Sequence, residues 1–511
     1  MLTKTFGSAV QGVNAYTITI EVVVGAGTNF FVVGLPDNAI KESQQRIESA
    51  LKLRGYRMPR TKVVVNMAPA DIRKEGAAYD LPIALGILHA SQQLQTERLP
   101  EYVIMGEMSL DGDLRPIRGV LPIAIQARKE GFKGIILPKE NAEEAAIVNN
   151  LDVIAVGSMQ EAIDFFEGRL EIAPTKVDTR NLFQHAVNKY TADFADVQGQ
   201  ENIKRALEIA AAGGHNVIMI GPPGAGKTML AKRLPSILPP LSMQEALETT
   251  KIHSVAGKLA GGGLLSTRPF RSPHHTISDV ALVGGGSNPQ PGEISLAHNG
   301  VLFLDELPEF KRTVLEVMRQ PLEERRVTIA RAKLSIEFPA SFMLIASMNP
   351  CPCGYYNHPE KECVCGPGVV QKYLNKVSGP LLDRIDLHVE VTPVTFDQMT
   401  ETRKSETSAE IQARVDQARQ VQTARFADYA DIHSNAMMPP QMVKDLCQIG
   451  DEGRTLLKTA MERLGLSARA YDRILKVART IADLAGTAEI QLPHLAEAIQ
   501  YRSLDREGWA G

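Results

Sequence analysis

A glycine-rich segment near the middle of the chain constrains the fold more than any other feature of the sequence. Residues 221–228 read GPPGAGKT and fit the pattern G-x-x-x-x-G-K-[ST]; the apolar run Asn216–Ile220 precedes them, and a helical pattern continues over Lys227–Leu234. In a strand, turn and helix of this kind, the backbone N–H groups of the turn can surround phosphate groups. The sequence therefore predicts an α/β core that binds a nucleoside triphosphate.

The residues of this segment have separate expected roles. Lys227 is expected to reach the β- and γ-phosphates, and the hydroxyl of Thr228 is expected to bind a magnesium ion. A glycine turn in front of an ordinary core helix is the alternative, and the strand before the segment disfavours it. The predicted ATP-binding residues are Gly221, Pro222, Pro223, Gly224, Ala225, Gly226, Lys227 and Thr228.

A second motif follows downstream, where the apolar run Val301–Leu304 leads directly into Asp305 and Glu306. An acid at the end of a buried strand can bind magnesium, and a second carboxylate beside it can polarise the water that attacks the γ-phosphate. A plain strand end with a solvated turn would look similar, but the upstream phosphate-binding pattern disfavours it. We therefore predict that Asp305 binds magnesium and that Glu306 is catalytic.

Three more polar residues complete the predicted catalytic set. The apolar run Phe342–Ala346 ends just before Asn349, whose amide is expected to orient the attacking water. Arg384 lies in GPLLDRIDL, which resembles the arginine-finger segment of ring ATPases, so it is expected to reach the nucleotide of a neighbouring subunit. Arg469, near the start of a predicted helix, resembles the arginine that closes the lid over ATP in such enzymes. A surface salt bridge is the alternative for either arginine.

The length of the chain predicts three compact units, because 511 residues are too many for one hydrophobic core. Short β-branched runs alternate with helical patterns over residues 1–175, which indicates an α/β unit. A linker is expected over 176–196, an ATPase core with a parallel sheet over 197–390, and an all-helical lid over 391–511. The predicted fold class is therefore α/β with a helical C-terminal region.

The composition and the lack of long apolar runs argue against a disordered, a fibrous or a membrane-spanning protein. The hydrophobic content of 44% and the charged content of 23% are ordinary for a globular protein, and the net charge of −3 means that any surface for nucleic acid must be local. Residues 1–10 lack a targeting pattern, and no run reaches the roughly 20 apolar residues needed to cross a bilayer. We therefore expect a cytoplasmic protein with no membrane partner.

Four cysteines cluster within the predicted ATPase core, in an insertion at residues 351–366. They form two C-x-C pairs, Cys351 with Cys353 and Cys363 with Cys365, and a glycine follows each pair. Clustered thiolates on a short loop favour a metal over disulfides in a reducing compartment, although C-x-x-C is the more usual zinc spacing. The sequence predicts structural zinc, with free thiols as the alternative.

These motifs together resemble the ComM/YifB family of the magnesium-chelatase-like AAA+ group over nearly the whole chain. The resemblance implies a homohexameric ring in which an insertion, here residues 268–286, and a hairpin, here residues 326–338, point into the pore. DNA-contact candidates on these segments are Arg268, Arg271, Arg331 and Lys333. An ordinary solvated edge is the alternative, and His274 and His275 are expected either to line the pore or to satisfy local backbone groups.

The N-terminal unit resembles the Lon protease domain around Lys74–Leu85 and Arg115–Glu140. Lon-type proteases need a serine activated by a lysine. Ala78 stands where the serine is expected, and Arg118–Ile123 offers no lysine. The resemblance therefore implies a catalytically inactive domain over residues 1–175 that serves as a DNA-binding or ring-forming platform, with Arg73 and Lys74 as candidate contacts.

The leading functional hypothesis is a hexameric DNA helicase or translocase that uses ATP and magnesium to drive branch migration of recombination intermediates, as the family resemblance implies for natural transformation. Its expected partners are branched or single-stranded DNA, further copies of the chain and recombinase-coated DNA. The alternative is a chelatase-type motor subunit that remodels a partner protein, and the Lon-like unit argues against it. An ATP-dependent protease is a third class, which the missing serine and lysine disfavour.

Overall fold

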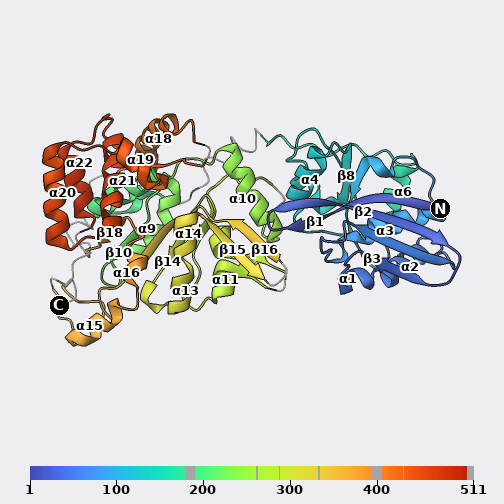
Figure 1. Cartoon of the computed structure of the whole chain (residues 1–511), viewed down its shortest axis with the longest axis horizontal. Coiled ribbons are helices and arrows are strands. Elements are labelled where there is room, and N and C mark those ends of the chain that lie inside the picture. Colours follow the sequence, from blue (N-terminus) through green and yellow to red (C-terminus); the bar gives the residue numbers. More distant parts are fainter. Residues whose placement is uncertain are drawn as a thin grey trace. The chain divides into compact units, whose positions relative to one another are not determined.

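The computed structural model describes residues 1–179, 190, 192–259, 263–286, 288–331, 334–358, 360–393, 405–429 and 431–502. By its internal packing the chain divides into two compact units, which Figure 1 shows with their elements labelled. The first unit consists of Met1–Ala186 and Met243–Ser266, and the second consists of Val187–Ser242 and Thr267–Gly511. None of the described helices combines the length and the apolar composition needed to cross a bilayer.

The first unit is built on a mixed seven-stranded sheet in the order β3-β4-β2-β1-β5-β8-β9. Along β2 the side chains of Ile18, Ile20 and Val22 are buried and alternate with more exposed polar residues, which is the period of a strand with one covered face. The strands are β1 (Leu2–Gln11), β2 (Asn14–Gly25), β3 (Phe30–Val33), β4 (Lys62–Ala68), β5 (Tyr102–Ile104), β8 (Gly134–Pro138) and β9 (Asp152–Val156), with a separate hairpin of β6 (Glu107–Met108) and β7 (Leu114–Arg115).

Helices and the sheet of the first unit share one hydrophobic core. The central helix α3 is apolar on nearly every side, and all but one of its residues are buried. The described helices of this unit are α1 (Asn38–Lys41), α2 (Ser43–Leu53), α3 (Asp80–Ala90), α4 (Val120–Lys129), α5 (Ala142–Ala145), α6 (Met159–Phe166) and α10 (Met243–Val255).

Helix α10 lies within the range expected for the ATPase core, 197–390, yet it packs in the first unit. The Ser254 hydroxyl donates a hydrogen bond to the Glu144 carboxylate at 2.5 Å, and the Gly119 amide donates to the Ser254 carbonyl at 3.2 Å. Leu247 and Leu264 pack against the core of the first unit. Position in the sequence therefore does not decide which core this segment joins; its apolar and polar contacts do.

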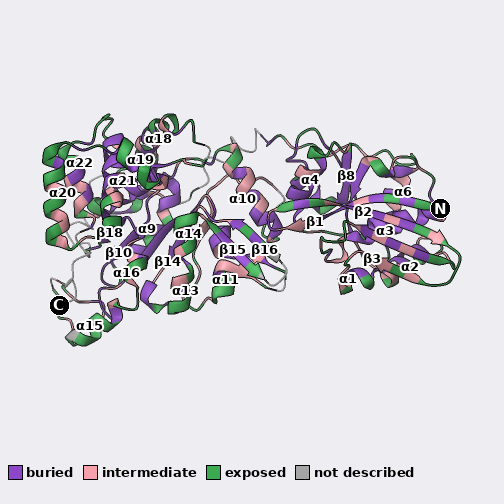
Figure 2. Cartoon of the chain, in the orientation of Figure 1, coloured by how far each residue is buried: buried purple, intermediate pink, exposed green. Residues whose placement is uncertain are grey.

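The second unit contains a five-stranded parallel sheet in the order β11-β14-β17-β10-β18. Every residue of β10, β14 and β17 is buried, as expected for parallel strands covered on both faces (Figure 2). The strands are β10 (Val217–Ile220), β11 (Phe270–Arg271), β14 (Val301–Leu304), β17 (Met343–Met348) and β18 (Leu387–Glu390), with hairpins of β12 (Gly284–Gly285) with β13 (Gln290–Pro291) and of β15 (Arg326–Arg331) with β16 (Leu334–Pro339).

The helical C-terminal region predicted from the sequence is present, and its buried residues belong to the same core as the parallel sheet. Helices α18 and α21 pack on α8, so the sheet and the helical region form one compact unit. The described helices of the second unit are α8 (Glu201–Gly213), α9 (Lys227–Arg233), α11 (Asp279–Val283), α12 (Glu293–Leu296), α13 (Arg312–Val317), α14 (Arg319–Glu324), α15 (Pro367–Leu374), α16 (Gly379–Leu382), α18 (Ser408–Arg425), α19 (Pro440–Leu446), α20 (Asp451–Leu464), α21 (Ala468–Leu484) and α22 (Leu492–Gln500). The expected linker 176–196 falls partly outside the described residues, which include 176–179, 190 and 192–196 of it.

A buried acid joins the sheet to the helical region. Asp386, just before β18, is 3% exposed and forms an ion pair with Arg473 of α21. Its carboxylate also accepts a hydrogen bond from the backbone amide of Asn216 at 2.9 Å, and Nδ1 of His215 lies 3.6 Å from the same carboxylate. Burial alone would raise the pKa of Asp386, but Arg473 and the neighbouring donors hold it below its usual value. Burial lowers the pKa of His215, so Arg473 is the main countercharge.

Replacing this acid should destabilise the second unit. Asp386→Asn leaves Arg473 without its countercharge, and because Arg473 is 20% exposed we expect a loss somewhat below the range for fully buried pairs, about 2 to 3 kcal/mol. The corresponding decrease in the midpoint of thermal unfolding is about 5 to 10 °C. Because the pKa of Asp386 is lowered in the folded state, the advantage of the wild type should shrink as the pH falls below about 4. Asp451→Asn, at a side chain that is 96% exposed, is the control and should change little; an equal effect of both variants would contradict this role for Asp386.

Candidate active site

The glycine-rich loop connects β10 to α9 and is closed by its own lysine. Lys227 Nζ donates hydrogen bonds to the carbonyl oxygens of Gly221 at 2.7 Å and Pro222 at 2.9 Å, and to Oδ1 of Asn349 at 3.1 Å. Gly224 and Gly226 have φ values of +80° and +82°, which only glycine adopts without strain. Burial lowers the pKa of Lys227, while Asp305 and Glu306 oppose this shift. The ammonium group therefore lies where phosphate oxygens could take the place of its neutral carbonyl partners. Hydrogen bonds to such charged acceptors are stronger than those to carbonyl oxygens.

Asp305 and Thr228 meet across the site, as a shared magnesium ion requires. Thr228 Oγ1 donates to Asp305 Oδ2 at 2.7 Å, and Asp305 Oδ1 accepts hydrogen bonds from the Ser347 hydroxyl and, at 3.1 Å, from the Glu306 amide. Parallel pairing sets Leu304, the last residue of β14, opposite Ala346 of β17, so Asp305 leaves its strand beside the C-terminal end of β17. A carboxylate and a hydroxyl are hard oxygen ligands, and they fit Mg²⁺.

Ser347 was not assigned a role from the sequence, although its position allowed one. It follows Ala346 in β17, and Asp305 follows Leu304 in the paired strand β14, so the register of the two strands alone places them side by side. A hydroxyl that donates to one carboxylate oxygen orients the other oxygen toward Thr228.

Glu306 follows Asp305 directly and has an unusual backbone conformation. Its φ of +54° is in the left-handed region, which is strained for a residue with a side chain, and its side chain is 58% exposed. Its Oε2 lies 3.7 Å from Nδ1 of His275, whose ring also packs against that of His274, with centroids 4.1 Å apart and the planes tilted by 34°. An exposed carboxylate next to a magnesium ligand can polarise a water molecule. His274 Nδ1 lies 2.9 Å from the Thr276 hydroxyl and accepts a hydrogen bond from the Thr276 backbone amide at 3.4 Å, so this ring satisfies a local backbone group, while pore lining by either histidine stays a prediction.

The two predicted arginines are not brought to this cluster. Arg384 is buried and forms an ion pair with Glu323 at 2.6 Å, and its Nη1 donates to the Pro380 carbonyl at 2.5 Å. Arg469 is exposed in the first turn of α21. The roles of both residues toward a nucleotide stay predictions.

Of the four candidate DNA contacts, two have described side chains and two do not. Arg268 donates to the carbonyls of Pro239, Pro240 and Asn299, and Arg271 forms a two-pronged ion pair with Glu293 at 2.6 and 2.8 Å. Both guanidinium groups therefore have structural contacts within the chain, which their exposure in a predicted loop did not suggest. The side chain of Arg331 and all of Lys333 lie outside the described residues, although the predicted hairpin around them is confirmed.

The two candidate contacts of the first unit also differ. Lys74 is buried, and its ammonium group donates to the carbonyls of Gly34, at 2.9 Å, and Pro69, so it is not available to DNA. Burial lowers its pKa. Arg73 is exposed and forms a surface ion pair with Glu75 at 2.8 Å. Only Arg73 keeps the accessibility that a phosphate contact requires.

The four clustered cysteines converge as a metal site requires. Cys351, Cys353 and Cys363 have sulfur atoms 3.3 to 3.7 Å apart, and all four sulfurs, including that of Cys365, lie within 4.8 Å of one another. Four Zn–S bonds of about 2.3 Å in a tetrahedron set sulfurs about 3.8 Å apart, so the cluster fits one zinc ion. Burial raises the pKa of Cys353, but the Tyr355 amide and Cys351 outweigh it and bring the value to about 6. Backbone donors lower the pKa values of Cys363 and Cys365, but burial and the neighbouring cysteines outweigh them and raise both, so without a metal the cluster favours one thiolate rather than four.

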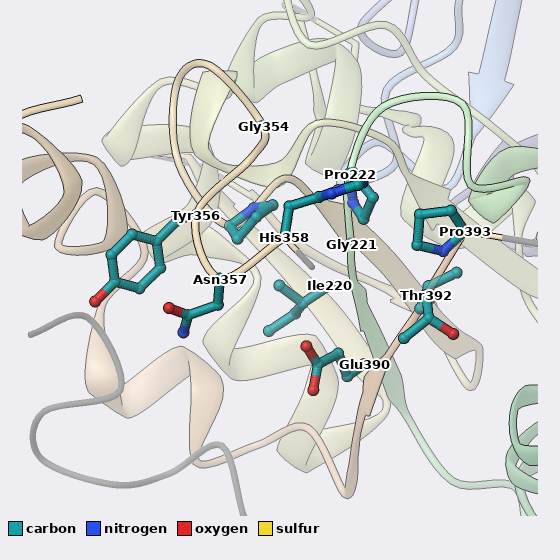
Figure 3. Close-up of a pocket in the computed structure, with 12 residues that line it drawn as sticks. Ile220, Gly221, Pro222, Gly354, Tyr356, Asn357, His358, Glu390, Thr392 and Pro393 are labelled. Carbon is teal, nitrogen blue, oxygen red and sulfur yellow. The ribbon is translucent and has the colours of Figure 1, made fainter. Parts of the chain in front are cut away.

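The loop of this cluster lies directly on the phosphate-binding loop. Gly354 has a φ of +87°, and a Cβ atom added there would stand 2.4 Å from Cδ of Pro223. Figure 3 shows the loop that carries Gly354 passing beside Pro222. The cysteine cluster can therefore stiffen the phosphate-binding loop through this contact, a connection between segments that are far apart in the sequence.

Loss of one ligand should remove the metal. We expect about one zinc per chain in the wild type and a large decrease in Cys353→Ser, measured by mass spectrometry of the metal content, together with a lower thermal midpoint. Cys447→Ala is the matched control, because Cys447 is buried in the core of the second unit away from the cluster, and it should keep the metal. Unchanged zinc in Cys353→Ser, or no zinc in the wild type, would reject the site.

Comparisons with known proteins agree with this geometry. The family profile described as Magnesium chelatase, subunit ChlI, matches residues 193–399; Subunit ChlI of Mg-chelatase matches 20–141; and Magnesium chelatase, subunit ChlI C-terminal, matches 405–502. Competence protein ComM of Haemophilus influenzae is 44% identical over 506 residues, which cover 98% of this chain and 97% of that protein. YifB of Escherichia coli is 44% identical over 503 residues, or 98% and 96% of the two chains.

A more limited similarity agrees with the expected likeness of the first unit to Lon proteases. Lon protease 2 of Bacillus subtilis is 29% identical over 126 residues, which cover 24% of this chain and 22% of that protein. The first unit keeps Ala78 in the short turn Ala77–Tyr79, at the position where the resemblance predicts a serine. The full-length similarity, the profiles and the ATP-binding geometry lead to one conclusion. The chain belongs to the ComM/YifB family of magnesium-chelatase-like AAA+ ATPases.

Proposed function

We propose that this protein is an ATP-driven DNA helicase or translocase that acts as a homohexamer and promotes branch migration of recombination intermediates during natural transformation. The observation that carries the proposal is the 44% identity to competence protein ComM across 98% of the chain. The geometry around Lys227, Thr228 and Asp305 supports the ATPase half, because it supplies phosphate and magnesium ligands in one place. The proposal also includes contacts with DNA and the assembly of a ring.

The β15–β16 hairpin is the segment best suited to contact DNA in this proposal. Arg268 and Arg271 are occupied within the chain, which leaves Arg331, the last residue of β15, and Lys333, which precedes β16 in the sequence, as the candidate contacts. Arg326, at the other end of the hairpin, is neutralised by Glu324 and Glu337, each 3.5 Å away. Contacts of two cations with phosphates carry no base information, which suits movement along any sequence, including recombinase-coated DNA.

Assembly would change the surroundings of Arg384. In the single chain Arg384 pairs with Glu323, and Nε of Arg384 has no hydrogen-bond partner among the described residues. A buried guanidinium with an unused donor is costly unless a further acceptor arrives. The γ-phosphate of a neighbouring subunit would be such an acceptor, and exchange of Glu323 for that phosphate would link hydrolysis to the ring.

A chelatase-type motor that remodels a partner protein is the second candidate, because all three matching profiles carry the chelatase name. The N-terminal unit does not separate the two candidates, since a chelatase profile matches residues 20–141 of it. The two functions differ in their ligand: the chelatase candidate predicts little affinity for DNA.

Branched DNA tests the proposal directly. The full-length protein should bind fluorescent forked and four-way junctions and separate their strands with ATP, whereas Lys227→Ala should bind DNA but separate no strands. Arg331→Ala with Lys333→Ala should weaken binding of every sequence and lower the salt dependence by about two ion equivalents, while Arg326→Ala, at a cation already neutralised by Glu324 and Glu337, should have a smaller effect. Absence of binding and strand separation on any branched DNA would refute the DNA motor and favour the chelatase candidate.

A further inference from the structure

A basic stretch of the first unit contrasts with the charge of the chain as a whole. Between Glu48 and Asp71 the sequence has five cations and no acid, although the whole chain has a net charge of −3. Residues 52–62, called the basic loop below, begin in the last turn of α2, which Figure 1 labels, and end at the first residue of β4. The cations of the basic loop are Lys52, Arg54, Arg57, Arg60 and Lys62.

Four of these five cationic groups face solvent rather than an acid. Arg54 is the exception, because its Nε donates to the Asp111 carbonyl at 2.8 Å and its Nη2 forms an ion pair with Asp113 at 2.7 Å. Elsewhere on this unit the exposed cations Lys133 and Lys139 lie 3.1 and 2.9 Å from an acid. The exposed cations of the basic loop that form no ion pair with a described residue are Lys52, Arg57, Arg60 and Lys62. The loop therefore carries positive charge that the fold itself does not neutralise.

Hydrogen bonds hold the backbone of the basic loop in one conformation. The Tyr56 amide donates to the Leu51 carbonyl at 2.8 Å, and Gly55 between them has a φ of +83°, as glycine allows after a helix. The Gln93 side chain bonds to both backbone groups of Arg57, since it accepts from the amide at 2.9 Å and donates to the carbonyl at 2.8 Å. The backbone that carries the cations is thus fixed before any ligand binds, which lowers the entropy lost on binding.

An exposed aromatic ring lies beside the basic loop. Phe31 of β3 is 44% exposed, and Nζ of Lys62 lies 5.3 Å from the centre of its ring. Strand β3 is at the edge of the sheet, and its pairing with β4 sets Phe31 opposite Val64, two residues after Lys62. Proteins that bind single-stranded nucleic acid combine cations for the phosphates with aromatic rings on which bases stack. The basic loop and Phe31 supply both kinds of group on one surface.

We propose that this surface binds single-stranded DNA: the four unpaired cations of the basic loop contact phosphates, and the ring of Phe31 stacks on a base. The inference rests on the proposed DNA motor and adds a contact in the first unit to the hairpin of the second. A single strand fits because its bases are free to stack on the ring, whereas those of a duplex are stacked on one another. Neither kind of contact reads a base, so the surface accepts any sequence.

Salt-dependent binding tests the charges. The full-length protein is titrated against fluorescein-labelled oligothymidylate of about 30 nucleotides, which is long enough for several binding sites of this kind. Arg57→Gln with Arg60→Gln should weaken binding about 5- to 30-fold at about 0.1 M salt and reduce the slope of log affinity against log salt by about 1.4, because each lost phosphate contact on a single strand removes about 0.7. Lys133→Gln with Lys139→Gln removes as many charges from the same unit, at cations already paired with acids, and should change neither quantity.

A second variant tests the aromatic ring. Phe31→Leu keeps an apolar side chain and removes the ring, so it should weaken binding of the single strand about 5-fold or more. The salt slope should stay as in the wild type, because stacking releases no counterions. Binding of a blunt duplex of the same length should not change, since its bases are not free to stack. Equal losses for the duplex and the single strand would overturn the choice of a single strand as the partner.

The outcomes separate this inference from the proposal on which it rests. If the wild type binds and separates forked DNA while Arg57→Gln with Arg60→Gln keeps the wild-type affinity and salt slope, the basic loop is not a DNA contact although the DNA motor stands. If the wild type binds no form of DNA, the proposed function itself is overturned. An ATPase rate without DNA and a thermal midpoint equal to those of the wild type show that the variants are folded.

Discussion

The parallel alignment of three buried strands is the constraint on which the candidate site depends. Strands β10, β14 and β17 end at one edge of the sheet, and there the chain delivers Gly221, Asp305 and Asn349 in turn. Each strand is buried along its whole length, and apart from Ser347 in β17 a polar residue appears only where the strand ends. Lys227 then bonds to the loop and to Asn349, and Thr228 bonds to Asp305, which ties the ends of all three strands together. Nucleotide chemistry is possible at this edge because the sheet fixes these groups before any ligand arrives.

Two further connections extend from that edge into the second unit. The cysteine loop follows Asn349 and returns onto Pro223, so the segment predicted to sense the phosphates and the segment predicted to bind them share a support. At the opposite end of the sheet, Asp386 joins β18 to Arg473 of the helical region, through a buried ion pair. A displacement of the helical region would therefore act on the strand beside β10. In addition, α10 leaves the ATPase segment of the sequence to pack in the first unit, so the chain runs between the two units at each end of that helix as well as at the linker.

Local patterns explain which parts of this arrangement could be predicted from sequence. The loop at 221–228 and the strand Val301–Leu304 are short continuous motifs, and the structure has them at the predicted residues. The helices Asp451–Leu464 and Ala468–Leu484 also follow a local period. Contacts between segments that are far apart in the sequence leave no local pattern from which they could be predicted. Three such contacts depend on the tertiary fold: His275 approaches Glu306, Arg271 forms an ion pair with Glu293, and α10 packs in the first unit. The sequence around a histidine, an arginine or a short helix does not show which distant residues it contacts.

The central claim is that this edge of the sheet hydrolyses ATP with Glu306 as the group that polarises water, and one pair of variants tests it. Glu306→Gln keeps the size and removes the charge of the side chain, so it should bind ATP as the wild type does and release phosphate at least about 100-fold more slowly. Glu309→Gln, three residues away at an exposed surface pair with Lys376, should hydrolyse ATP normally. Phosphate release at the wild-type rate by Glu306→Gln, measured at saturating ATP, would contradict the account.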